Sequence, residues 1–406
     1  MGGGLAGVTA SIACAGEGRS VLIVERQSFL GGHAASFCCK AAEKCLECGL
    51  CAAMGRFRSL AGNRLVEKLF CSEVSSFSGE MPPFSAEITV RQNPVDPLEC
   101  TSCGLCEAEC PAGAVTRNHE AIPPQFYVID GVKCLRSAGE SCSRCADLCP
   151  AKCIDFSRTS KIVEVNPRAV ILAAGYDSLD ALSLPQYGYG SIEGVITAHE
   201  LEGLLASQGE LSMAGPEGRP RRIAFIQCAG SRNPHKGRDY CSTVCCPYAL
   251  RLARMIRHRD PAAEVTVFYI DLQPVGKSHG AFIEGCRGDE KLRLLKALPA
   301  RLSPVTGGVS IEYEEMAKGT NVVEQFDLVV LSTGITPSGG NHLLESLYGI
   351  SLTRDGFIKT LEDGSTGREG VFAAGSSTAP MDMEGTIISA SAAAARVISY
   401  LGGERN

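Results

Sequence analysis

Two runs of cysteines lie within the first 150 residues of this 406-residue chain. The first run has the spacing C-x2-C-x2-C-x3-C-P, and the second has the spacing C-x7-C-x2-C-x3-C-P. With the first spacing, three thiolates hold one [4Fe–4S] cube and the fourth cysteine reaches a second cube. A chain with two such runs is therefore expected to carry electrons. The runs consist of Cys100, Cys103, Cys106 and Cys110, and of Cys134, Cys142, Cys145 and Cys149.

The ligands of a two-cluster ferredoxin interleave between the two runs. This rule predicts one cluster on Cys100, Cys103, Cys106 and Cys149, and a second on Cys134, Cys142, Cys145 and Cys110. Residues 136–141 must then form a loop, and Cys134 is the ligand that departs most from the common spacing. Structural zinc and disulfides are the alternatives, but neither explains why both runs end in cysteine–proline.

Composition excludes several classes of protein. The formal net charge is −6 and there is no run of Lys or Arg, so the chain offers no basic surface for nucleic acid. No uninterrupted apolar stretch reaches the roughly 18 residues of a membrane-spanning helix, and no leader precedes a cleavage site. The 21 cysteines are clustered rather than dispersed, which favours reduced thiols that hold metal. These features predict a cytoplasmic protein without a transmembrane segment.

The chain opens with a glycine fingerprint for dinucleotides. Gly2, Gly4 and Gly7 form G-x-G-x-x-G before a helical pattern at 8–16, and Glu25 follows an apolar strand at 21–24. Glycines let a helix N-terminus approach a pyrophosphate, and an acidic residue about 20 positions later accepts the ribose hydroxyls. The fingerprint should follow a first strand, so we expect the natural protein to begin several residues before Met1.

A third group of cysteines follows this fingerprint. Cys45, Cys48 and Cys51 have the spacing of three ligands of another cube, with Cys38, Cys39 or Cys71 as candidates for the fourth. No cysteine–proline pair closes this run. A structural group of reduced cysteines and a redox-active pair therefore remain alternatives.

A second domain is expected after residue 215. Residues 221–227 and 263–271 read as buried strands, but the glycine-rich loop of a nicotinamide domain is missing between them. Four thiols stand there instead, so direct oxidation of NAD(P)H is not expected. These thiols are candidates for an irregular cluster site, and they belong to Cys228, Cys241, Cys245 and Cys246.

These segments resemble the A subunit of heterodisulfide reductase and its relatives, which are iron–sulfur flavoproteins of the thioredoxin-reductase type. The resemblance rests on FIQCAGSR at 225–232, YC at 240–241, VCC at 244–246, FYID at 268–271, GK at 276–277 and GVFAAG at 370–375. It implies an FAD in the first domain, an unusual [4Fe–4S] cluster at the Cys228 group, and electron transfer that bifurcates in some members. The residues expected at the flavin are Gly2, Gly4, Gly7, Glu25, Gly31, Gly32, Gly175, Gly375 and Ser376.

The expected fold is α/β, with two Rossmann-like domains of the flavin-disulfide-reductase type and an inserted two-cluster ferredoxin module. The flavin domain is expected at 1–90, 156–215 and 336–406, the insert at 91–155, and a vestigial NAD-like domain at 216–335. The expected cofactors are FAD and three [4Fe–4S] clusters, with Cys45, Cys48 and Cys51 as candidates for a fourth.

The expected partners are other subunits of a redox complex: heterodisulfide reductase B- and C-like subunits, a hydrogenase or dehydrogenase, and ferredoxin. A homodimer is expected within that complex. Gln273 and Ser376 depart from residues common in the family, Arg and Asp respectively, which leaves bifurcation and simple relay both open. The alternatives are a relay subunit of a quinone-linked or sulfur-metabolism complex, a thiol–disulfide enzyme, and a scaffold with an empty flavin site.

Overall fold

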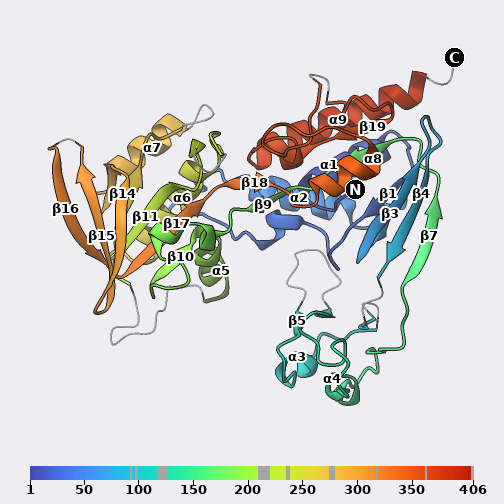
Figure 1. Ribbon diagram of the computed structural model, residues 1–406, viewed down its shortest axis with the longest axis horizontal. Coiled ribbons are helices and arrows are strands. Elements are labelled where there is room, and N and C mark those ends of the chain that lie inside the picture. Colours follow the sequence, from blue (N-terminus) through green and yellow to red (C-terminus); the bar gives the residue numbers. More distant parts are fainter. Residues whose placement is uncertain are drawn as a thin grey trace.

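The computed structural model contains two α/β units joined by a pair of extended strands, and a small cysteine-rich module attached to the first unit (Figure 1). The α/β class agrees with the sequence prediction. The structure describes residues 1–91, 94–96, 99–117, 126–208, 220–234, 238–273, 279–316, 318–361 and 364–403. Gly276 and Lys277, which contribute to the family resemblance, lie outside these ranges.

The first unit forms around the glycine-rich start of the chain. Its parallel strands are β1 (Val21–Val24), β2 (Val66–Leu69), β8 (Val170–Leu172) and β19 (Val371–Ala373), and its long helices are α1 (Leu5–Gly16), α2 (Leu50–Leu60) and α9 (Met383–Gly403). β1 pairs with β2, and β8 pairs with β19. Met1 lies between the two pairs, because its carbonyl accepts from the Ala173 N–H while the Gly2 N–H donates to Val24. Alanines on α1 and α9 pack together and bring these helices close.

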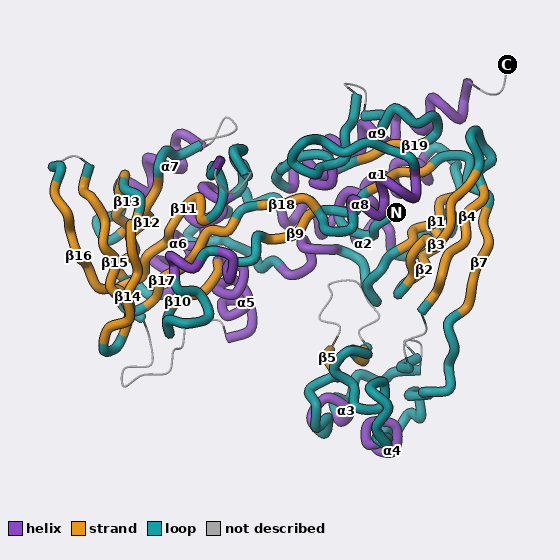
Figure 2. The backbone as a smooth tube through the Cα atoms, in the orientation of Figure 1, coloured by secondary structure: helices purple, strands orange, loops and turns teal. Residues whose placement is uncertain are grey.

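A twisted antiparallel sheet at the edge of the first unit holds the cysteine-rich module. Its strands are β3 (Ser72–Ser78), β4 (Ser85–Val90) and β7 (Lys161–Val165), in that spatial order. The module leaves this sheet at the end of β4 and returns at the start of β7 (Figure 2). Its own elements are α3 (Leu105–Ala108), β5 (Val115–Arg117), β6 (Tyr127–Ile129) and α4 (Arg144–Leu148). Cysteines supply much of its small core, so the module has few aliphatic side chains to bury.

The second unit is a parallel five-stranded sheet covered on both faces. The strands, in spatial order, are β10 (Val195–Thr197), β17 (Leu328–Thr333), β11 (Arg222–Ala229), β12 (Glu264–Tyr269) and β13 (Leu292–Lys296). One face packs on the helices α5 (Ala198–Gln208), α6 (Cys245–Arg259) and α7 (His279–Arg287). The opposite face packs on the meander β14 (Pro299–Val305), β15 (Gly308–Glu315) and β16 (Thr320–Phe326). Because both faces are buried, the central strands are apolar without alternation.

Two short antiparallel strands, β9 (Tyr176–Ser178) and β18 (Ile335–Pro337), connect the units. The chain then enters α8 (Asn341–Tyr348) and returns to the first unit. The sequence prediction ended the flavin domain at residue 215, which is too late, because β10 and α5 already belong to the second sheet. A three-residue strand has too little hydrophobic pattern to be recognised in the sequence. Short 3-10 helices include η1 (Gly32–Ser36), η2 (Ala181–Ser183), η3 (Pro185–Tyr187) and η5 (Gly375–Ser377).

Within the described residues, no helix is both long enough and apolar enough to cross a membrane.

Candidate flavin and iron–sulfur sites

Gly2, Gly4 and Gly7 at the start of the chain leave the backbone uncovered by side chains, and we call this segment the glycine cradle. Gly2 has a φ of 93°, and a Cβ on Gly7 would lie 1.9 Å from the Gly2 carbonyl oxygen. Gly4 caps α1 without any side-chain hydrogen bond, so the first N–H groups of α1 are available to an anion. This combination of close backbone and an open helix N-terminus fits the pyrophosphate of a dinucleotide.

Glu25 lies at the edge of this cradle, directly after β1. Its carboxylate accepts a hydrogen bond from the Gly3 N–H at 2.6 Å and another from the Gln27 N–H at 2.7 Å. A carboxylate oxygen can accept more than one hydrogen bond, so Glu25 retains capacity for ribose hydroxyls. The position agrees with the one predicted for a ribose-binding acidic residue.

Other predicted flavin residues also border the cradle. Gly31 forms a backbone bridge with Gly4, and a Cβ on Gly32 would lie 3.2 Å from the Gly4 Cα. Gly375 has a φ of 72° and would clash with Ala6 if it carried a Cβ. Gly175, with a φ of 71°, has nothing within 4 Å of its Cβ position, and Ser376 is buried in η5. These residues fit an FAD, although their contacts with it stay a prediction.

Three cysteines of the first ferredoxin run line a small hollow. The two runs interleave here, because Cys149 of the second run lies on the same hollow as three cysteines of the first, namely Cys100, Cys103 and Cys106. A further thiol, Cys153, also lines the hollow, with its sulfur 3.4 Å from that of Cys149. The thiols present fit one cube, and their assignment as ligands stays a prediction.

Backbone N–H groups around Cys110 favour the ionised form of its thiol. Burial opposes ionisation of this thiol, but N–H groups of the four residues from Ala112 to Val115 point at the sulfur and lower its pKa overall. The Ala114 N–H donates to the sulfur at 3.2 Å. Thiolates are the ligands of iron–sulfur clusters, and hydrogen bonds to the sulfurs adjust the cluster potential.

Of the remaining cysteines of the second predicted cluster, Cys134 and Cys145 lie in the same small core, and Cys142 lies near Cys145. Burial raises the pKa of the Cys145 thiol, and the neighbouring Cys134 and Cys142 thiols raise it further. The loop at 136–141 that the long spacing required is present, and the Arg136 guanidinium lies over the Phe156 ring at 4.8 Å. The structure thus places Cys134, Cys142 and Cys145 together, while Cys110, just after α3, packs against the same core.

A second small hollow lies in the other unit and is lined by all four cysteines of the irregular group, Cys228, Cys241, Cys245 and Cys246. α6 begins at Cys245, so two of these thiols occupy its first turn, where the helix dipole favours a thiolate. Burial, and then the neighbouring thiols, raises the pKa of Cys228 to about 11, and Arg232 acts in the opposite direction. The Arg232 guanidinium pairs with Asp271, which also lines the hollow. Four thiols in one buried hollow fit a cluster that would offset these costs of ionisation.

The third cysteine run has the same backbone shape as the first ferredoxin run. In C-L-E-C-G-L-C at 45–51, Glu47 and Gly49 have φ values of 52° and 83°. In C-T-S-C-G-L-C at 100–106, Ser102 and Gly104 have φ values of 55° and 86°. Each loop runs into a helix that begins at the Leu of its motif. This likeness favours a cluster at Cys45, Cys48 and Cys51 over a chance group of thiols, and the fourth ligand is not identified.

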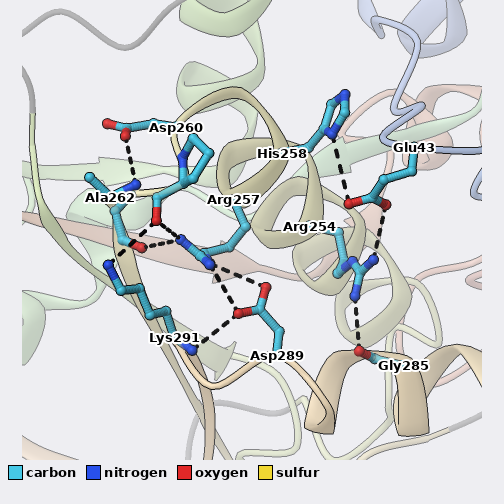
Figure 3. A network of polar contacts seen from close by, with 11 residues as sticks. Glu43, Arg254, Arg257, His258, Asp260, Ala262, Gly285, Asp289 and Lys291 are labelled. Atoms are coloured by element: carbon cyan, nitrogen blue, oxygen red, sulfur yellow. Dashed lines mark hydrogen bonds and ion pairs between the residues drawn. The ribbon is translucent and has the colours of Figure 1, made fainter.

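Basic residues of α6 hold the third cysteine run from the second unit. The Arg251 guanidinium donates to the carbonyls of Leu46 and Glu47 at 2.8 and 2.9 Å. One turn further along, Arg254 and His258 both contact Glu43, at 3.1 and 3.7 Å (Figure 3). These contacts fix the third cysteine run against the helix that carries Cys245 and Cys246.

Sequence reasoning missed a buried charged network between the units. Lys40 and Glu202 form an ion pair in which both side chains are at most 3% exposed. Tyr248 donates to the Glu202 carboxylate, and the Cys38 N–H donates to it at 2.7 Å. Neither Lys40 nor Glu202 lies in a motif, so the sequence carried no signal for the pair. Among the residues that the structure describes, no three His, Cys, Asp or Glu side chains form a group that could hold a single metal ion.

Two family models match parts of the chain. The model described as FAD dependent oxidoreductase matches residues 1–55, and the model described as 4Fe-4S binding domain matches residues 94–116. Thioredoxin reductases from T. acidophilum and Lactococcus lactis superimpose with TM-scores of 0.54 at 15% identity. Each superposition covers 99% of this chain and 97% of that chain. The fold is thus shared with the thioredoxin reductases, and the matched segments are similar to FAD-dependent oxidoreductases and to 4Fe-4S binding domains.

Curated proteins with similar sequences are A subunits of heterodisulfide reductases. The chain is 31% identical to an iron–sulfur A subunit of the CoB–CoM heterodisulfide reductase of Methanopyrus kandleri, over 99% of this chain and 64% of that protein. The corresponding A subunit of Methanocaldococcus jannaschii is also 31% identical, over 98% of this chain and 63% of its own length. The chain is similar to these A subunits of heterodisulfide reductase over nearly all of its residues, in agreement with the resemblance seen in the sequence. It spans somewhat less than two thirds of the length of these relatives.

Proposed function

We propose that this chain is an electron-transferring FAD and iron–sulfur subunit of a heterodisulfide reductase-like complex. It would bind one FAD in the glycine cradle, two [4Fe–4S] clusters in the inserted module and a third at the Cys228 group. A fourth would lie at Cys45, Cys48 and Cys51. The named A subunits include one from a ferredoxin:CoB–CoM heterodisulfide reductase of Methanosarcina acetivorans, 30% identical over 99% of this chain and 56% of that protein.

The observation that carries this proposal is the continuous connection from one cysteine site to the flavin cradle. α6 carries Cys245 and Cys246 at its start, and its Arg251 holds the third cysteine run. On the far side of that run, a Cβ on Gly49 would lie 3.0 Å from Met383, the first residue of α9. α9 in turn packs along α1, whose N-terminus opens into the cradle. The cysteine sites and the cradle are thus joined through packed, rigid elements.

The chain's own residues bind and adjust these groups. The first N–H groups of α1 bind the pyrophosphate, and Glu25 orients the ribose. The N–H groups around Cys110 stabilise thiolate sulfur, and Arg232 places a positive charge beside Cys228. When bound, the flavin exchanges electrons as pairs and the clusters exchange them singly. The assembled protein would therefore convert two-electron transfer into one-electron transfer.

The partners that we propose are the other components of such a complex, B- and C-like subunits and a hydrogenase or dehydrogenase, together with ferredoxin. We propose a homodimer within this complex. We propose a cytoplasmic location, because thiols that bind clusters must stay reduced. The finer proposal is electron bifurcation, in which the electrons of one pair are divided between a high-potential and a low-potential acceptor. Reconstitution with partner subunits tests this proposal. Bifurcation predicts that ferredoxin is reduced only while a high-potential acceptor is also reduced, whereas a relay subunit would reduce either acceptor alone.

An anaerobic reductive titration of the purified chain tests the proposal. Dithionite should deliver about two electrons to the flavin and about one to each cluster, so three clusters predict about five electrons per chain and four clusters about six. Absorbance follows the flavin, and electron paramagnetic resonance follows the clusters. Uptake limited to about two electrons would leave a simple flavoprotein and would contradict the proposal.

A further inference from the structure

Two buried polar side chains lie unpartnered at the ends of adjacent strands in the second unit. Gln227 on β11 and Ser332 on β17 are each 1% exposed. Among the described residues, neither the amide nitrogen nor the amide oxygen of Gln227 has a hydrogen-bond partner, and the Ser332 hydroxyl has none. A buried polar atom without a partner destabilises the folded state, so native proteins rarely retain one unless it serves a purpose.

Gln227 and Ser332 occupy neighbouring positions on adjacent strands, at the point where the register between these strands shifts. Ile226 on β11 pairs with Leu331 on β17, and Gln227 and Ser332 are the next residues on each parallel strand. Side chains alternate along a strand, so Gln227 shares a face with Phe225 and Ser332 shares a face with Val330. Phe225 and Val330 pack in the core between the sheet and α6. Gln227 and Ser332 therefore belong to the α6 side of the sheet.

The strand ends meet the cysteine site at this point. Cys228 follows Gln227 directly, and the Cys245 sulfur lies 4.0 Å from the carbonyl oxygen of Thr333, which follows Ser332. Cys245 begins the 15-residue helix α6, whose first N–H groups have no intrahelical acceptor. The two orphaned side chains thus belong to the residues directly before Cys228 and before Thr333, on the side of the sheet where α6 begins with Cys245. Carboxyl ends of parallel strands are where α/β sheets bind their ligands.

We propose that Gln227 and Ser332 donate hydrogen bonds to sulfur atoms of the cluster held by the Cys228 group and so raise its reduction potential. This inference rests on the proposed function, which places a cluster at these four cysteines. Reduction adds negative charge to a cluster, and donors aimed at its sulfurs stabilise that charge. The two residues act through the cluster environment and are positioning residues rather than ligands.

The test is the midpoint potential of this cluster in the purified, anaerobically reconstituted full chain, measured by paramagnetic resonance during a redox titration. Gln227→Met keeps the side-chain length but removes the donor, and Ser332→Ala removes the hydroxyl. Each change should lower the midpoint potential of the cluster at the Cys228 group, and the double variant should lower it further. The ferredoxin clusters of the same molecules should keep their potentials.

A matched control separates this role from a general effect of removing a buried amide. Asn341→Leu replaces another amide that is 1% exposed, on α8 of the first unit, where its nitrogen donates to the Gly356 carbonyl. This variant should lose thermal stability without any change in the midpoint potential. In metal-free protein, by contrast, Gln227→Met should not lower the melting temperature, because it removes an unpaired polar group.

The outcomes distinguish this inference from the proposed function. An unchanged potential in Ser332→Ala and Gln227→Met, with the cluster present, overturns the inference and leaves the proposed function standing. If one variant fails to load iron, the other carries the measurement. A wild-type chain without iron at the Cys228 group would overturn the third cluster of the proposed function, and this inference with it.

Discussion

Gly7→Ala tests whether close backbone contact shapes the flavin cradle. A Cβ at this position would lie 1.9 Å from the Gly2 carbonyl oxygen and 3.0 Å from the carbonyl carbon. Helix propensity alone favours Ala over Gly by about 1 kcal/mol. Overpacking of a rigid site costs about 1–3 kcal/mol, and here the clashing atoms belong to the backbone and cannot rotate away. We therefore expect net destabilisation, with the backbone around Gly2 displaced.

The assay measures FAD content and unfolding together. Displacement of the cradle should reduce FAD affinity by about an order of magnitude or more, since each 1.4 kcal/mol changes a dissociation constant tenfold. The flavin absorbance of the purified protein reports its FAD content, and urea unfolding of the flavin-free chain reports its stability.

Gly16→Ala is the matched control on the same helix. Nothing lies within 4 Å of a Cβ at Gly16, the last residue of α1. This variant should bind FAD normally, and its stability should be unchanged or higher by about 0.5–1 kcal/mol. If Gly7→Ala matched Gly16→Ala in both FAD content and stability, the close approach of Gly7 to Gly2 would not shape the site.

Three further changes test other parts of the structure. Cys149→Ala should remove the same paramagnetic resonance signal as Cys103→Ala, and Cys110→Ala should remove the signal of the other ferredoxin cluster. Loss of the same signal in all three variants would contradict the interleaved assignment. Glu202→Leu should lower the free energy of unfolding in urea by about 3–5 kcal/mol, because it leaves Lys40 charged and buried. Adding Lys40→Met should recover most of that loss. A Glu202→Leu variant as stable as wild type would refute this expectation. Burial lowers the pKa of His33, so the unfolded chain binds its proton more readily and stability falls as the pH drops below about 6.5. His33→Gln should reduce the stability difference between pH 7.5 and pH 5.5, and an equal difference in both proteins would contradict the assignment.

Local patterns in the sequence predicted local features of the structure. Cysteine spacing depends only on nearby residues, and the structure brings Cys149 to the hollow of the first run as the interleaving rule requires. The glycines and Glu25 also lie where their spacing predicts, because the cradle forms within one strand–helix unit. The helix α1 begins at Leu5, before the predicted 8–16, because Gly7 in its first turn conceals the helical pattern.

Contacts between distant segments could not be predicted from the sequence. Lys40 meets Glu202 across 162 positions, and Arg251 meets Leu46 across 205. Such pairs depend on how the two units dock, which no periodicity or motif encodes. The boundary of the second domain was misplaced for a similar reason, because β10 becomes recognisable only once it pairs with β17.

The most direct measurement of the central claim is the amount of iron, sulfide and flavin per chain after anaerobic purification. The proposed electron-transfer subunit predicts about 12 to 16 irons, corresponding to three or four cubes, with one FAD. About eight irons would mean that only the inserted module holds clusters, and this result would contradict a cluster at the Cys228 group. A chain with almost no iron would contradict the proposed function as a whole and would point to thiol–disulfide chemistry instead.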